Sequence, residues 1–276
     1  LWIERQLSTG TSPFDLALPA LMVWSVATLW LLAPRFAAVW SRRVASTVRH
    51  LTDAERAIAL RYAELHWAFF DRFVTAETSW LAPDNFQADP EPVVAMRTSP
   101  TNVGLQLLST VSACDLGFIS AVDMTERLER TIATMGTLAR YRGHFYNWYD
   151  LNGLQVLEPR YVSTVDSGNL AGHLIALRQA CLQMALNDAS LSLRLRTLAD
   201  LAYTMLMEMD FTFLYDDARK LFTIGFHPDS FTADASHYDL LASEARLASF
   251  VAIAKNEVPV EHWFRLSRSL NRTVGT

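Results

Sequence analysis

Residues 141–173 read YRGHFYNWYDLNGLQVLEPRYVSTVDSGNLAGH, and both ends of this stretch adjoin predicted helices. Its first ten residues alternate rings with polar groups, namely Tyr141, Phe145, Tyr146, Trp148 and Tyr149 with Arg142, His144, Asn147 and Asp150. A buried strand would not carry that many hydrogen-bonding groups, and a solvated loop would not carry that many rings. Rings beside fixed donors and acceptors suit a sugar, because a pyranose has C–H faces and a rim of hydroxyl groups. An aromatic hairpin packed on a helical core, turning at Asn152-Gly153, is the alternative interpretation.

Capping and turn residues predict helices on both sides of this stretch. Thr52 and Glu55 form a capping box that starts a helix running to about residue 78. Ser99-Pro100 predicts the start of a helix that closes at Gly117, after a proline-rich loop over residues 81–98. Further helices are predicted at about 123–140, 167–186, 191–209, 236–255 and 261–270, and a second short hairpin at 211–226.

This order of elements predicts an all-α protein with short β-hairpins in its loops. Amphipathic helices that alternate with long loops can stack as a bundle, a solenoid or an (α/α) toroid. The sequence has no fixed-period repeat, which argues against a tetratricopeptide-type array. The loops that carry function would then lie together at one end of the helices.

The composition excludes several classes of function. The net charge of −5 leaves no basic footprint for nucleic acid. The sequence has no cysteine–histidine cluster with zinc spacing and no glycine-rich phosphate loop, so we expect neither a metal nor a cofactor. Cys114 and Cys181 lie in apolar helical contexts and are predicted to be buried free thiols of a reducing compartment. Because the chain begins at Leu1 without a methionine and stops at Thr276 just after a helix-like run, we expect both ends to be cuts through a longer protein.

The N-terminal region is apolar. Residues 16–33 contain no charged residue and include Trp24 and Trp30, and their number is close to what spans a bilayer. Pro34 is predicted to end this helix, and arginines follow at positions 35, 42, 43 and 49. A transmembrane or interfacial helix and a buried core helix both fit this pattern. We therefore divide the chain into a membrane-proximal or linker region, residues 1–50, and a helical domain, residues 51–276.

Glu244 is unusual in its predicted helix. Helical spacing places it on one face with Leu240, Leu247 and Val251, where an unpaired carboxylate is costly. Such a residue can form a structural ion pair with an arginine of another helix. Alternatively, we expect burial to raise the pKa of this carboxyl group, so that it can protonate a leaving oxygen.

Three more loops carry polar groups close to predicted helix starts. Asp84 and Asn85 lie in the proline-rich loop, and Arg97 lies just before the next helix. Asp166 can cap a later helix, with Asn169 in its first turn. Together with the aromatic stretch, these loops predict a carbohydrate cleft at the N-terminal ends of the helices.

Five long blocks of sequence follow one another in the order PDNFQ (83–87), RTSPTN (97–102), YRGHFYNWYD (141–150), PRYVSTVDSGNLAGHL (159–174) and YDLLASEARLASFVAIAK (238–255). In this order they resemble the middle region of bacterial cyclic β-1,2-glucan synthases, which are very large inner-membrane proteins. The resemblance implies that residues 51–276 are the N-terminal part of an (α/α)-toroid cyclisation domain. In that family the domain is an anomer-retaining transglycosylase that closes linear β-1,2-glucan into a ring.

The resemblance also implies the setting of this domain. It predicts a bacterial inner-membrane protein with the domain on the cytoplasmic side and possible membrane contact through residues 16–33. The expected partners are the β-1,2-glucan chain and the remaining domains of the parent synthase.

The resemblance assigns the acid/base role to Glu244. A retaining mechanism needs a second carboxylate roughly 5 Å away. That residue is expected in a later block resembling WGISES, which this chain does not contain, so the isolated chain is expected to be inactive. Simple hydrolysis of β-1,2-glucan and a non-catalytic glucan-binding module are the alternatives. The candidate substrate-binding residues are Asp84, Asn85, Arg97, Arg142, His144, Trp148, Asp166, Asn169, Tyr238 and Asp239.

Overall fold

The computed structural model describes residues 13–41, 50–238 and 246–266. The chain divides into two compact units, Leu1–Glu55 and Arg56–Thr276. Each unit is described by itself.

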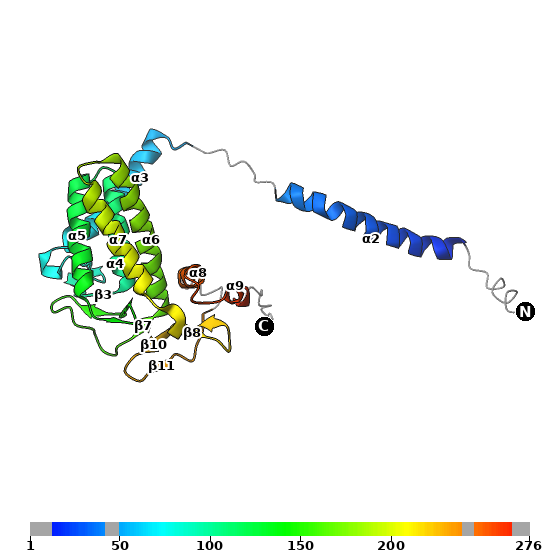
Figure 1. Ribbon diagram of the computed structural model, residues 1–276. Helices are drawn as coiled ribbons and strands as arrows, with labels where there is room; N and C mark the ends of the chain where they lie inside the picture. The colour runs from blue at the N-terminus through cyan, green and yellow to red at the C-terminus, as the bar shows by residue number, and fades with distance from the viewer. Residues whose placement is uncertain (1–12, 42–49, 239–245, 267–276) are drawn as a thin grey trace, which may run out of the picture. The chain divides into compact units, whose positions relative to one another are not determined.

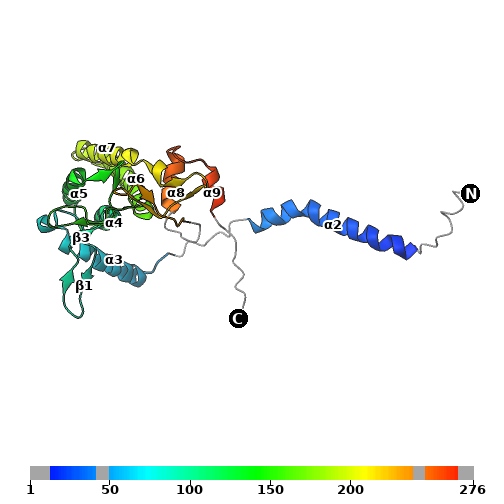
Figure 2. The ribbon, with the colours of Figure 1, turned by 90° about the horizontal axis from the view of Figure 1, so that it is seen from below.

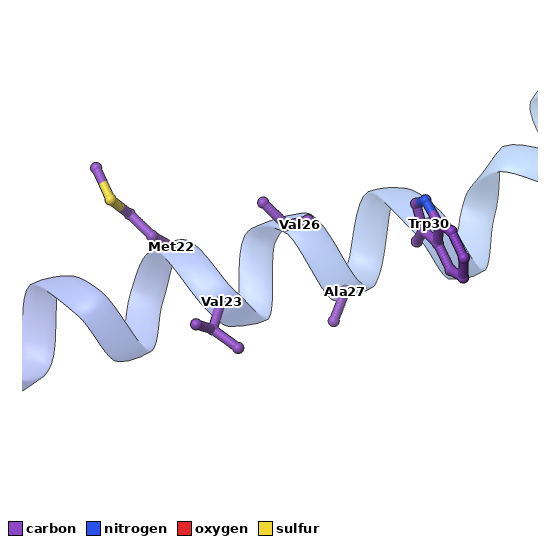
Figure 3. A pocket seen from close by; sticks show the side chains of 5 residues that line it. All are labelled: Met22, Val23, Val26, Ala27 and Trp30. Carbon is purple, nitrogen blue, oxygen red and sulfur yellow. The ribbon is translucent and has the colours of Figure 1, made fainter.

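Helix α2 (Pro13–Trp40) dominates the described part of the first unit. The apolar side chains of this helix from Leu21 onward are almost all exposed, and Trp30 reaches 83% exposure. Figure 3 shows five of them, from Met22 to Trp30, which line a shallow surface of this helix alone. The segment Leu21–Trp40 is long and apolar enough to cross a membrane, and 0% of it is buried. A membrane contact of this helix stays a prediction, and so does the alternative of a buried core helix.

The prediction that Pro34 ends this helix is wrong, because α2 continues to Trp40. A proline inside a helix removes one backbone hydrogen bond, and the helix can pass through it with a local kink. The hydroxyls of Ser25 and Thr28 donate to the carbonyl oxygens of Leu21 and Trp24 at 2.8 and 2.7 Å. These two polar groups are thus satisfied within the helix, as an apolar surrounding requires.

The helices of the second unit form two layers, seen from two directions in Figures 1 and 2. In one layer the central helix α6 packs between α4 and α8, and in the other layer α5 packs beside α7. The two layers meet where α6 packs on α7 and α4 packs on α5. The helix bounds are α3 (Asp53–Phe73), α4 (Pro100–Asp115), α5 (Ala121–Thr137), α6 (Thr164–Asn187), α7 (Ser192–Glu208), α8 (Arg246–Ala254) and α9 (Glu261–Arg265).

The core lies between these layers. Leu107 of α4, Leu128 of α5, Leu174 and Leu177 of α6 and Leu195 of α7 are fully or almost fully buried. Burying an aliphatic side chain of this size contributes about 1.5–3 kcal/mol relative to leaving it exposed. The facing leucines therefore hold the two helix layers together.

The strands of the described residues are short, and they lie in the loops. Four pairs form two-stranded sheets: β1 (Phe86–Gln87) with β2 (Val93–Val94), β3 (Arg97–Thr98) with β6 (Tyr149–Asp150), β4 (Arg140–Tyr141) with β5 (His144–Phe145), and β8 (Tyr215–Asp216) with β9 (Leu221–Phe222). A three-stranded sheet has the order β11 (Thr232–Ala233), β10 (Gly225–His227) and β7 (Val162–Ser163). The prediction of an all-α protein with short hairpins is confirmed.

The capping box of Thr52 and Glu55 starts α3 at Asp53, as predicted. The start of α4 also agrees with the sequence, while two other predicted starts do not. Ser99 caps α4 as predicted, and its Oγ accepts from the Asn102 backbone N–H at 3.2 Å. α6 is capped by Ser163, whose Oγ accepts from the Asp166 backbone N–H at 3.2 Å, so it starts earlier than predicted. The predicted helix start at residue 236 is wrong, because the Tyr238 backbone N–H donates to the Phe222 carbonyl at 2.9 Å in an extended segment.

Candidate functional site

Two strands bring the aromatic stretch to the starts of helices α4 and α6. β3 pairs antiparallel with β6 and leads directly into α4, and β7 leads in the same way into α6. Thr101, in the first turn of α4, donates from Oγ1 to Oδ1 of Asp166, in the first turn of α6, at 2.7 Å. The N-terminal ends of α4 and α6 therefore lie at the same end of the layer, as the sequence predicted for its polar loops.

Asp84 organises one half of this site. Its Oδ2 accepts from Nε and Nη2 of Arg97 at 3.2 and 3.0 Å, and its Oδ1 accepts from Nδ2 of Asn102 at 3.2 Å. Asn85 adds a fourth donor, with Nδ2 at 3.1 Å from Oδ2. The carboxylate is largely covered and the guanidinium reaches the surface, at 17% and 49% exposure. A carboxylate with two donors on one guanidinium fixes the orientation of that guanidinium.

Trp148 occupies the other half and is held from two sides. The Arg97 guanidinium lies over its indole ring, 4.4 Å from the ring centroid. With the Asn147 amide oriented to match its neighbours, its oxygen accepts from Trp148 Nε1 at 3.0 Å and its nitrogen donates to Asp166 Oδ2 at 2.9 Å. Asp166 then has both oxygens engaged, because Oδ1 accepts from Thr101. The indole orientation is thus linked to the first turns of both helices.

The structure brings six of the predicted substrate-binding residues into one cluster, which we call the Asp84–Trp148 cluster. Hydrogen bonds hold each half together, and the contact of Arg97 with the Trp148 ring joins the halves. Asn169 joins it through Nδ2, which donates to Thr101 Oγ1 at 3.2 Å. Sequence reasoning did not select Thr101, Asn102 and Asn147 as site residues, although they lie within the quoted motifs. The six predicted members are Asp84, Asn85, Arg97, Trp148, Asp166 and Asn169.

Arg142 and His144 lie elsewhere, on the side of Asp210. Arg142 places Nε 3.5 Å from Asp210 Oδ2 and its guanidinium 5.4 Å from the centre of the Phe213 ring. His144 is fully buried, with Nδ1 2.9 Å from Ser167 Oγ and Nε2 2.8 Å from the Asp210 carbonyl oxygen. Both ring nitrogens of His144 are engaged inside the protein, so the structure does not place it where a ligand can reach it. A substrate contact by either residue stays a prediction.

The electrostatic surroundings of His144 explain its state. Burial lowers the pKa of the imidazole to about 4, and this effect exceeds the opposing effect of the hydrogen bond to the Asp210 carbonyl. The ring is therefore neutral at pH 7. A neutral imidazole with two fixed partners connects β5 to α6 and to the segment that follows α7.

The remaining predicted residues precede α8 in the sequence. Tyr238 is partly buried at the edge of a described segment. Asp239 and Glu244 lie outside the described residues, so their predicted roles stay untested.

The position of α8 itself is described. A Cβ added to Gly168, near the start of α6, would lie 2.4 Å from the backbone nitrogen of Ala248. The start of α8 therefore packs closely against the start of α6, where Asp166 is located.

The side chains of the Asp84–Trp148 cluster are suited to a neutral ligand with many hydroxyl groups. The cluster offers carboxylates, amides, a guanidinium and an indole ring, and the charge of Arg97 is balanced by Asp84. Within the described residues, no group of three or more His, Cys, Asp or Glu side chains is arranged to hold a metal ion.

Comparison with known proteins relates the chain to a glucan synthase. No family model matches the chain. The chain is 32% identical to the cyclic β-(1,2)-glucan synthase NdvB of Rhizobium meliloti (strain 1021), in an alignment that covers 94% of the chain. The resemblance to cyclic β-1,2-glucan synthases is confirmed. The chain spans only 13% of the length of that synthase.

Solved structures establish the fold. The endo-β-1,2-glucanase of Chitinophaga pinensis, in complex with sophorotriose and glucose, has a TM-score of 0.59 and 15% identity, over 78% of this chain and 50% of that chain. The β-1,2-glucanase of Parabacteroides distasonis has a TM-score of 0.60 and 13% identity, over 81% and 31%. A mutant endo-β-1,2-glucanase of Talaromyces funiculosus, in complex with β-1,2-glucan, has a TM-score of 0.58 and 12% identity, over 76% and 50%. The helices are therefore part of an (α/α) toroid, as predicted.

Proposed function

We propose that this chain is a segment of a cyclic β-1,2-glucan synthase and contributes to an anomer-retaining transglycosylation that cyclises linear β-1,2-glucan. The observation that carries the proposal is the Asp84–Trp148 cluster at the common end of α4 and α6. Its residues come from the same sequence blocks that resemble the synthases. The identity of 32% to a cyclic β-(1,2)-glucan synthase supports the same substrate and reaction.

The cluster supplies binding and orientation. Trp148 presents a flat apolar ring of the kind that packs on the C–H face of a pyranose. The Arg97 guanidinium lies over this ring and reaches the surface, and Asn85 adds an exposed amide beside Asp84. Asp84 holds Arg97 in place, and Asp166 holds Trp148 through Asn147. A pre-arranged site of this kind loses less entropy on binding than one whose side chains must order first.

Glu244 is proposed as the acid/base. Support comes from its sequence position two residues before α8, a helix that begins beside the start of α6. In a retaining transglycosylation this carboxyl group protonates the departing glycosidic oxygen and then takes a proton from the incoming sugar hydroxyl. The second carboxylate, which carries the covalent glycosyl intermediate, is expected from another part of the parent synthase. We therefore expect the isolated chain to bind glucan without cyclising it.

Hydrolysis is the second candidate, because structures of β-1,2-glucanases share the fold. The two reactions differ only in whether a sugar hydroxyl or water attacks the intermediate. Product analysis separates them, since cyclic glucan comes from transglycosylation and short linear sugars come from hydrolysis. A glucan-binding module without catalysis would give neither product.

The membrane setting is also a proposal. The exposed apolar segment Leu21–Trp40 supports contact with a bilayer. We propose that the parent protein is located in the bacterial inner membrane and that the toroid lies on its cytoplasmic side, since arginines follow the apolar segment in the sequence.

The test is Glu244→Gln in the parent synthase. This change keeps the size of the side chain and removes its acid, so glucan binding should persist while cyclisation falls by about two orders of magnitude or more. Glu208→Gln is the control, because Glu208 forms an ion pair with Arg140 at 2.6 Å and is half exposed. Near-normal cyclisation by the Glu244→Gln enzyme would remove the acid/base assignment.

A further inference from the structure

A second polar cluster lies on the three-stranded sheet β11-β10-β7. Tyr161, just before β7, donates from Oη to Asp234 Oδ2 at 2.5 Å, and Asp234 Oδ1 lies 3.5 Å from His227 Nε2. The Tyr161 and His227 rings are also in contact, with their centroids 4.9 Å apart. We call these three residues the Tyr161–Asp234 cluster.

Gly225 makes this arrangement possible. A Cβ at Gly225 would lie 2.3 Å from both Cζ and Oη of Tyr161. The phenol therefore crosses the backbone of β10 at a position that only glycine leaves open, and this brings its hydroxyl to Asp234. The cluster depends on a close approach of ring and backbone that chance contacts on a surface do not require.

The cluster keeps polar atoms available at the surface. The side chains of Asp234 and His227 are 30% and 38% exposed. Their mutual distance of 3.5 Å is long for a hydrogen bond, so the Asp234 oxygen can accept from another donor. Among the described residues, His227 Nδ1 has no hydrogen-bond partner.

The charges of this cluster favour a neutral ligand over an anion. The nearest arginine in sequence, Arg160, is already paired with Glu158 and Asp229 at 3.1 and 3.7 Å. Asp234 would repel an anion that approached His227. A carboxylate acceptor, an imidazole and a phenol ring together suit a hydroxyl-rich ligand.

The two clusters are continuous. The backbone N–H of Asn147 donates to the Tyr161 carbonyl at 2.7 Å, and the Asn147 side chain bonds both Trp148 and Asp166. Burial raises the pKa of the Tyr161 phenol, and the hydrogen bond to Asp234 raises it further. Asn147 thus bonds the indole of the first cluster through its side chain and the Tyr161 backbone of the second through its own backbone.

We propose that the Tyr161–Asp234 cluster is a second contact for the same polyhydroxylated chain, where Asp234 and His227 bind the hydroxyl groups of a further glucosyl unit. This inference rests on the proposed function, since it takes β-1,2-glucan as the ligand. Tyr161 orients Asp234, and Gly225 provides the space for Tyr161.

The test measures binding of linear β-1,2-glucan to the full chain and to three variants. Asp234→Asn and His227→Gln should each weaken binding by about tenfold, the usual cost of one hydrogen bond to a charged or polar partner. Asp229→Asn is the matched control on the same sheet segment, and its affinity should equal that of the wild type. Thermal unfolding of each variant shows whether its fold is kept. His227→Gln leaves the hydrogen bond between Tyr161 and Asp234 intact, so it tests ligand contact without removing that bond.

A second measurement detects the contact between His227 and glucan directly. The imidazole NMR signal of His227 should shift when glucan is added to the wild-type chain. Wild-type affinity in both Asp234→Asn and His227→Gln, with an unmoved His227 signal and a weakened Trp148→Ala variant, would overturn this inference and leave the proposed function standing. A wild-type chain that binds no β-1,2-glucan would overturn both.

Discussion

Asp84 and Asp166 illustrate how carboxylates act in this site at the scale of single residues. Each accepts hydrogen bonds on both oxygens, Asp84 from Arg97 and Asn102, and Asp166 from Thr101 and Asn147. A carboxylate with donors on both oxygens has a fixed orientation. It can in turn orient its partners, the Arg97 guanidinium beside Asp84 and the Trp148 indole through Asn147 beside Asp166.

His144 gives a prediction on pH. Its pKa in the folded protein is about 4, below the value of 6.5 expected for an unfolded chain. The unfolded state therefore binds the proton first as the pH falls, and the free energy of unfolding decreases between pH 6.5 and pH 4. The decrease from this residue is up to about 3 kcal/mol.

Urea unfolding at several pH values measures this effect. His144→Gln should be less stable at pH 7, but its stability should depend less on pH between 6.5 and 4.5. His66→Gln is the control, because it makes the same substitution at an exposed position on α3. Equal pH dependence in wild type and His144→Gln would contradict the assignment.

At the scale of elements, replacing either of two helical glycines by alanine should change stability in opposite directions. A Cβ at Gly168 would lie 2.4 Å from the Ala248 backbone, so Gly168→Ala must push α8 away from α6. We expect the free energy of unfolding to fall by about 1–3 kcal/mol, which is typical of an overpacked contact.

Gly136 in α5 has nothing within 4 Å of an added Cβ, so Gly136→Ala should raise the free energy of unfolding by about 0.5–1 kcal/mol. Chemical unfolding compares them, and a stable Gly168→Ala variant would contradict the close packing of α6 on α8.

Helix α2 gives a prediction on membranes. Its exposed tryptophans, Trp24 and Trp30, should show a blue-shifted fluorescence when lipid vesicles are added to the chain, because the rings enter an apolar medium. Val26→Asp places a charge in the middle of the apolar segment and should weaken this partition, at a cost of about 2.5–3.5 kcal/mol. Unchanged fluorescence of the wild-type chain with vesicles would contradict a membrane role for α2.

Element boundaries show how far the sequence determines the fold. Ser99 followed by Pro100 is a local signal, and α4 starts there as predicted. The start of α6 was missed because Asp166 and Ser167 also fit a cap, and the pairing of β7 with β10, a contact between residues distant in sequence, selects Ser163 instead. The segment before residue 239 was predicted as helix on its periodicity, but its backbone pairs with Phe222.

The candidate site shows the same difference between what local sequence indicates and what tertiary contacts decide. The sequence selected Asp84, in the proline-rich loop, and Asp166, close to a predicted helix start, as polar groups within motifs. The structure brings both into one cluster, and their roles in binding stay predictions. His144 carries the same polar signal, yet the structure buries it against Ser167. The sequence does not distinguish these cases, because the face on which a loop residue points depends on tertiary pairing.

At the scale of the whole molecule, exposed apolar groups predict association. Each solved structure described above extends well beyond the part that this chain matches, at 50% coverage or less. Phe250 of α8 and Phe264 of α9 are 65% and 74% exposed, which is unusual for large rings in a compact protein. We expect the isolated chain to self-associate, and Phe250→Glu to reduce this association in sedimentation measurements. A monodisperse wild-type monomer with a sharp, cooperative melt would contradict this expectation.

The central claim is that the Asp84–Trp148 cluster binds β-1,2-glucan, and titration calorimetry with linear β-1,2-glucan tests it most directly. The wild-type chain should bind, and Trp148→Ala should weaken binding by about tenfold or more, since the ring contact with a pyranose is lost. Trp24→Ala, on α2, is the matched control and should bind like the wild type. Equal affinity of the Trp148→Ala and wild-type chains, with both folded, would contradict the account.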